Sequence, residues 1–240
     1  SNECVEAPIT SDSMLIQRNL MKNCGKRNPP LCPSCGRGHA IYARYDNSII
    51  EYNTVDTAGG YGYHVHCSDN PIACPSGVNN NIIRFNRATN TQGPGMLVGN
   101  GTNNVAYGNM LDRNALRGNG TANFFIISNG GIAYNNTVTN GGGVGILSAY
   151  WDNKIIKNNL VIGNADNRIL FDAENDGIYE TPVGSVTTNN IITGTAASHF
   201  ISPSTGDFHL LSTSPAKHTG ATLGAPYDKD FDGVSRPQGS

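Results

Sequence analysis

The sequence predicts an all-β solenoid, in which short strands wind into stacked coils. Three observations point to this fold: one short phrase recurs seven times, asparagine (31) and glycine (29) are abundant among 240 residues, and helical periodicity is nearly absent. Charged residues make up only 14% of the chain and the formal net charge is −2, so the basic surface of a nucleic-acid-binding protein is missing. The 38% of apolar residues can form a core, which argues against disorder. No apolar run approaches the roughly 20 residues that span a bilayer.

The repeated phrase consists of two β-forming residues, two polar or aromatic residues and an asparagine, followed by another short strand. The anchoring asparagines are separated by 34, 33, 23, 27, 23 and 31 residues and are Asn19, Asn53, Asn86, Asn109, Asn136, Asn159 and Asn190. A minimum period with variable insertions is typical of stacked coils, whose extra residues form loops. Asparagines in neighbouring coils, about 4.8 Å apart, can hydrogen-bond to one another. Asparagine also tolerates the left-handed backbone of a corner between strands.

A further strand follows each asparagine after a Gly-rich interval, with copies at 40–43, 63–66, 96–99, 125–128, 146–149 and 169–172. The whole pattern resembles a right-handed parallel β-helix of about seven coils. The stretch from Asp207 to Pro237 resembles the closing segment of secreted bacterial β-helix proteins, whose ends need a cap. We therefore expect an N-terminal extension over 1–10, the β-helix over 11–200 and a C-terminal capping segment over 201–240.

Cysteine usage favours a secreted or cell-surface protein with local disulfides. All six cysteines lie in the first third of the chain: Cys4, Cys24, Cys32, Cys35, Cys67 and Cys74. Cys67 and Cys74 flank one insertion and are expected to pair. The other four allow three arrangements that the sequence does not separate.

One segment points to chemistry, Tyr61-Gly62-Tyr63-His64-Val65-His66-Cys67. It resembles the Tyr-Gly-Phe-Asp-Pro-His-acid motif of mannuronan C5-epimerases and related alginate lyase β-helices, and it matches at Tyr61, Gly62, Tyr63 and His66. The resemblance implies that Tyr61 and His66 form the acid/base pair acting on the C5 proton of an acidic glycan. The family's Asp is His64 here, and its acid after the histidine is Cys67, so the family's charge arrangement is altered.

Removal of a proton beside a carboxylate also needs a group that neutralises the carboxylate. Arg44 or a protonated His64 is the candidate. The alternative interpretation is that the segment is an ordinary β-helix strand without catalytic residues.

The alternation of side chains along the strand decides whether the histidines are accessible. If Tyr63 and Val65 point into the core, His64 and His66 face outward. The outward column would then also hold apolar residues, expected to be Ile41, Leu97, Ile126, Leu147 and Leu170. The opposite alternation would bury both histidines. We favour the outward arrangement.

Further candidates follow from residue type. Aromatic and polar side chains expected on the same face are candidates for holding sugar rings: Arg44, Tyr45, Tyr150, Trp151, Asp172 and Glu174. Asp228, Asp230 and Asp232 have the spacing of a calcium loop without its distal Glu, which makes calcium the candidate cofactor. The sequence thus predicts an extracellular polysaccharide-active protein, lyase- or epimerase-like on an acidic glycan. The alternative is a non-catalytic glycan-binding or cell-surface structural module.

Overall fold

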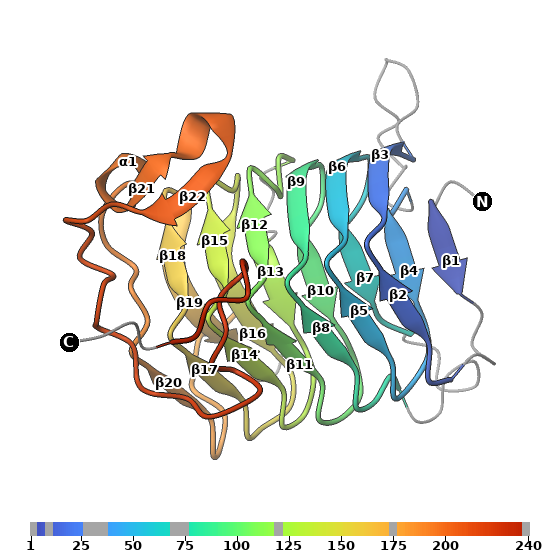
Figure 1. The fold of residues 1–240 in the computed structure, drawn as a ribbon. Helices are drawn as coiled ribbons and strands as arrows, with labels where there is room; N and C mark the ends of the chain where they lie inside the picture. Colours follow the sequence, from blue (N-terminus) through green and yellow to red (C-terminus); the bar gives the residue numbers. More distant parts are fainter. Residues whose placement is uncertain are drawn as a thin grey trace.

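Three parallel sheets run along the length of the molecule, and each coil of the chain adds one strand to each sheet (Figure 1). A computed structural model describes residues 4–7, 12–25, 38–67, 77–117, 122–172 and 177–236. The first sheet contains β1 (Val5–Ala7), β4 (Ile41–Ala43), β7 (Tyr63–Val65), β10 (Met96–Val98), β13 (Ala122–Ile126), β16 (Val144–Ala149) and β19 (Asp166–Asp172). The second contains β2 (Leu15–Gln17), β5 (Ile49–Glu51), β8 (Ile82–Arg84), β11 (Val105–Tyr107), β14 (Ile132–Tyr134), β17 (Ile155–Lys157) and β20 (Val186–Thr188). The third contains β3 (Leu20–Cys24), β6 (Thr54–Ala58), β9 (Arg87–Thr91), β12 (Met110–Asp112), β15 (Thr137–Thr139) and β18 (Leu160–Ile162). This is the parallel β-helix that the repeats predict.

The seven anchoring asparagines form one continuous ladder between the second and third sheets, as expected. Each Nδ2 donates a hydrogen bond to the Oδ1 of the next asparagine at 2.9–3.1 Å, in six links from Asn19 to Asn190. The left-handed corner lies one residue earlier than predicted. The residues that adopt it, with φ of 52–64°, are Arg18, Tyr52, Phe85, Gly108, Asn135, Asn158 and Asn189. The ladder therefore imposes this conformation even on the bulky Tyr52 and Phe85, for which it is uncommon.

The core fills the space between the three sheets. Strand register stacks inward residues of successive coils, as in the column of Ile50, Ile83, Ala106, Ala133 and Ile156 on the second sheet. All five have an exposed fraction of 0%. Burial of these columns along the whole rod supplies the main driving force for folding.

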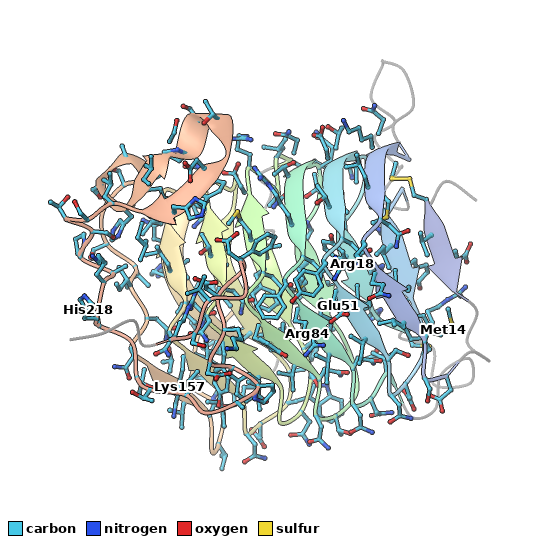
Figure 2. All side chains as sticks on the ribbon, viewed as in Figure 1. Met14, Arg18, Glu51, Arg84, Lys157 and His218 are labelled. Carbon is cyan, nitrogen blue, oxygen red and sulfur yellow. A yellow bond between two sulfur atoms is a disulfide. The ribbon has the colours of Figure 1, made fainter. Side chains whose placement is uncertain are left out.

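The β-helix begins before residue 11, because β1 pairs in parallel with β4 and forms the edge of the first sheet. A disulfide joins Cys4, beside β1, to Cys24 at the end of β3 (Figure 2). This pair is one of those that the sequence leaves open, and Cys32 and Cys35 lie outside the described residues. Cys67 is disulfide-bonded, and its expected partner Cys74 lies outside the described residues.

The C-terminal region covers outer faces of the last coils. A short unit of α1 (Ala196–His199), β21 (Phe200–Ser202), a 3-10 turn (Pro203–Thr205) and β22 (Asp207–Leu210) packs Phe200 and Phe208 against Leu160 and Ile162 of the third sheet (Figure 1). The following segment crosses the second sheet, where the Tyr227 ring lies 5.0 Å from the rings of both Tyr107 and Tyr134. Among the residues that the structure describes, no helix has the length and apolar character needed to cross a membrane.

Candidate functional site

The histidines of the motif lie on the outer side of the first sheet, as predicted. Tyr63 and Val65 have an exposed fraction of 0% and belong to the core. Residues between and beyond them on a strand point the other way, so His64 and His66 face outward. His64 is half-buried and His66 is 9% exposed. The pair therefore lies on the outer face but is well shielded from solvent.

The predicted outward apolar column is wrong at two positions. The register pairs His64 with Tyr42 on one side and Leu97 on the other, and Leu97 with Phe125. Ile41 and Ile126 instead point inward and are fully buried. Both errors are slips of one residue, and a one-residue slip moves a side chain to the opposite face of a strand.

Five aromatic rings form a continuous cluster on this face, hereafter the ring cluster: His39, Tyr42, Tyr61, His64 and His66. His64 is at its centre, with ring centroids 4.3 Å from His39, 4.7 Å from Tyr42, 4.6 Å from Tyr61 and 5.2 Å from His66. The His64 ring stacks almost parallel to those of Tyr42 and His66, at 9° and 7°. Tyr61 and His66, the predicted acid/base pair, thus both lie within contact of the same imidazole.

His39 and Tyr42 were missed at the sequence level. The backbone hydrogen bond from Gly60 to Gly38, together with the pairing of Ile41 with Tyr63, places His39 beside Tyr61 and Tyr42 beside His64. Alignment of Gly38-His39 with Gly60-Tyr61 would have found both residues, because each precedes a first-sheet strand by the same interval.

Burial sets the protonation state of the central histidine. The pKa of His64 is well below its usual value, chiefly because burial disfavours the charged ring and secondarily because His39 and His66 add nearby positive charge when protonated. Its Nδ1 is enclosed and has no hydrogen-bond partner in the described part of the chain. His64 is therefore neutral near pH 7 and does not act as the protonated carboxylate-neutralising group.

Arg44 supplies the cation of the site. It follows β4 on the coil next to β7, and its guanidinium lies 4.7 Å from the centroid of the Tyr42 ring. The Arg44 Nη2 lies 2.7 Å from Glu6 Oε1, and the Arg44 Nε is buried without a hydrogen-bond partner among the described residues. The neighbouring Tyr45 does not share this face: it is 2% exposed and packs in the core.

The other predicted sugar-binding residues lie farther along the first sheet. Tyr150 and Trp151 follow β16 at a left-handed corner and are 39% and 53% exposed. Asp172 ends β19 and is 5% exposed. Three strand steps separate β7 from β16 and four separate it from β19, or about 14 and about 19 Å, so this group is separate from the ring cluster. Glu174 lies outside the described residues.

The predicted calcium loop is a turn stabilised by its own carboxylates. Asp230 Oδ1 accepts hydrogen bonds from the backbone of Asp232 and Val234 at 3.0 and 2.7 Å, and Asp232 Oδ2 lies 3.0 Å from His209 Nε2. The backbone carbonyl of Asp228 accepts a hydrogen bond from the backbone N–H of Arg236. In the described ranges no three His, Cys, Asp or Glu side chains are placed together as metal ligands.

The ring cluster and Arg44 together combine two phenols, three imidazoles and one guanidinium on one face of the β-helix. Such a set offers proton donors, proton acceptors and one fixed positive charge. Comparisons with protein-family models, with curated proteins and with solved structures found no match to this chain.

Proposed function

We propose that this protein is an extracellular, polysaccharide-active β-helix protein that removes the C5 proton of a uronate in an acidic glycan, in a lyase- or epimerase-like reaction at the ring cluster. The observation that carries the proposal is the contact of Tyr61 and His66 with one central neutral imidazole, with Arg44 on the adjacent coil. The Cys4–Cys24 disulfide is consistent with an extracellular location.

Each step of such a reaction has a residue of suitable chemistry in this cluster. His66 accepts the C5 proton, and the Tyr61 hydroxyl donates a proton, either to the opposite face of the sugar in epimerisation or to the leaving oxygen in elimination. Arg44 neutralises the carboxylate, which acquires charge when the proton leaves. The Glu6 carboxylate, 2.7 Å from Arg44, occupies the position that a substrate carboxylate would take, so substrate binding displaces Glu6 in this scheme.

The neutral His64 has a different role in the proposal. Stacked on the ring of His66, it limits the orientation of the proton acceptor. Because it remains uncharged, it adds no positive charge that would make His66 a weaker base.

The test is a panel of alginate, pectin and glycosaminoglycans, assayed for unsaturated uronate by ultraviolet absorbance and for deuterium uptake at C5 in heavy water. The two readouts cover elimination and epimerisation. The expected result is a signal on at least one glycan that is lost in His66→Ala and Tyr61→Phe. His218→Ala is the matched control, since His218 is an exposed histidine far from the first-sheet motif in sequence (Figure 2). Activity retained in both site variants, or the absence of both unsaturated uronate and deuterium uptake on every glycan that binds, would overturn catalysis here.

A non-catalytic glycan-binding module is the second candidate. The observation in its favour is the exposed pair of Tyr150 and Trp151, whose rings can stack on sugar rings. Binding without turnover that weakens in Trp151→Ala, and not in His66→Ala, would support the module in place of the enzyme.

A further inference from the structure

A second polar site lies on a different sheet from the ring cluster, on the outer face of the third sheet. An open groove of about 360 Å³ crosses β3, β6, β9 and β12, and its polar lining includes Lys22, Asp56, Arg87, Thr89, Asn90 and Arg113. Strand register aligns Lys22, Asp56, Thr89 and Asp112 in one row. Three strand steps give the row a length of about 14 Å, so the groove can accommodate an extended ligand.

Two arginines of the groove are held in place by neighbouring groups. The Arg87 guanidinium lies 5.7 Å from the centroid of Phe208 and packs against Gly206, where an added Cβ would come within 2.3 Å of Arg87 Nη2. Arg113 donates through Nε to Asn90 Oδ1 at 3.2 Å, and its Nη1 lies 2.8 Å from the buried Asp112. The C-terminal unit that contains β21 and β22 thus holds Arg87, one of the lining residues, in place.

The groove also has positive charge that its own carboxylates do not neutralise. Within the described residues neither Lys22 nor Arg87 forms an ion pair. Asp56 accepts weak hydrogen bonds at 3.3 Å from Asn90 and Thr57. The lining therefore offers two cations without a salt bridge, of which Arg87 is near enough to Asp112 to act on its pKa, and one carboxylate that can accept further hydrogen bonds.

We infer that this groove binds an anionic glycan, with acid groups on Lys22 and Arg87 and sugar hydroxyls on Asp56 and Asn90. A simple inorganic anion would satisfy the two cations, but it would be repelled by Asp56. A sugar acid satisfies both kinds of group, since its carboxylate or sulfate accepts from the cations and its hydroxyls donate to the carboxylate. The site shares a ligand class with the proposed function but does not depend on catalysis at the ring cluster.

The test is calorimetric titration of the full chain with an oligouronate, a neutral oligosaccharide of equal length and inorganic sulfate. The variants are Lys22→Ala, Arg87→Ala, Arg44→Ala and Lys157→Ala. We expect the oligouronate to bind more tightly than sulfate, and its affinity for the groove to fall about tenfold in Lys22→Ala and in Arg87→Ala. Arg44→Ala removes the cation of the first-sheet site, so any uronate binding that it loses reports on that site. Lys157→Ala removes a cation of β17 in the second sheet, outside both sites, and is the control that should leave groove binding unchanged.

The Arg87→Ala variant needs a folding control, because it loses the packing of Arg87 on Phe208. Its thermal unfolding is therefore measured alongside binding, and Lys22→Ala, at an exposed residue, is a second variant that leaves this packing intact. Loss of binding in Arg44→Ala alone would overturn the groove while supporting the first-sheet site. Binding of sulfate as tight as the oligouronate would reduce the groove to an anion site and overturn the glycan assignment. Groove binding that persists while turnover is absent would support this inference and contradict only the proposed enzyme.

Discussion

The backbone N–H of Tyr61 donates a hydrogen bond to His39 Nδ1 at 3.1 Å. An acceptor nitrogen carries no proton, so this bond requires the form of the His39 ring that has no proton on Nδ1. This bond joins two adjacent coils beside the motif, and it fixes the start of the segment that carries Tyr61.

Removal of this acceptor should therefore affect both stability and the site. In His39→Ala the partly buried N–H of Tyr61 loses this partner, which costs about 1–3 kcal/mol of unfolding free energy. His39→Asn retains a side-chain acceptor and should recover part of the loss. Chemical denaturation of both variants measures the effect, and equal stabilities for the two would show that the hydrogen bond contributes nothing. If the proposed function holds, turnover should follow the same order.

The central histidine should make the protein sensitive to mild acid. The folded-state pKa of His64 is depressed, so below the unfolded value of about 6.5 the unfolded chain takes up a proton that the folded chain does not. Stability therefore falls with decreasing pH, with a slope from this group of up to about 1.4 kcal/mol per pH unit. His64→Phe keeps a stacked ring without a titrating group, and its acid slope should be shallower than that of the wild type. Urea denaturation at pH 7, 6 and 5 gives both slopes; parallel curves would contradict the assignment.

The asparagine ladder predicts that replacing an asparagine in its middle lowers the unfolding free energy much more than replacing one at its end. Asn109 donates to Ile83 O and Asn136 Oδ1 and accepts from the backbone and side chain of Asn86, all at 2.9–3.1 Å. Asn109→Ala leaves several buried groups unpaired and should cost about 2–5 kcal/mol. Asn19→Ala at the exposed end should cost about 1 kcal/mol or less. Similar losses at both positions would show that the ladder does not act through buried hydrogen bonds.

The same ladder explains how much of the fold the sequence could predict. It fixes the register of the second and third sheets at every coil, because each asparagine bonds the next one. The first sheet was aligned correctly where its strand begins ten residues after the asparagine, as at Tyr63 and Met96. Where a longer insertion intervenes, before Ile41 and Phe124, the predicted copies were displaced by one residue.

These displaced copies account for the incomplete prediction of the site. Tyr61, His64 and His66 were placed on the correct face because their coil has the regular interval. His39 and Tyr42 belong to the coil with the longest insertion, where periodicity gives no register. Tyr45 was assigned to the outer face with Arg44, although consecutive residues of an extended segment point in opposite directions. The length of the insertion before the strand therefore explains why His64 and His66 could be placed from the sequence and why His39 and Tyr42 could not. The error at Tyr45 has a separate cause.

A buried lysine near the exposed aromatic pair gives the last prediction. Lys154 is 0% exposed, and its Nζ donates to the backbone carbonyls of Ala149, at 2.6 Å, and Tyr150. Burial lowers the pKa of Lys154 to about 8 from its usual 10.5. Between these two values the folded protein has lost a proton that the unfolded chain retains, so stability from this group rises with pH. The neutral amine keeps two N–H donors, enough for both carbonyls.

We therefore expect the stability difference between wild type and Lys154→Met to grow in favour of the wild type by about 2–3 kcal/mol from pH 7 to pH 10. The variant should be less stable at both pH values, because the two carbonyls lose their donor. Lys157→Met is the matched control, since Lys157 is only half-buried on the outer face of β17 (Figure 2). Urea denaturation of the three proteins at both pH values measures the differences. A change of the same size in Lys157→Met would show that general charge effects, and not the enclosure of Lys154, cause the pH dependence.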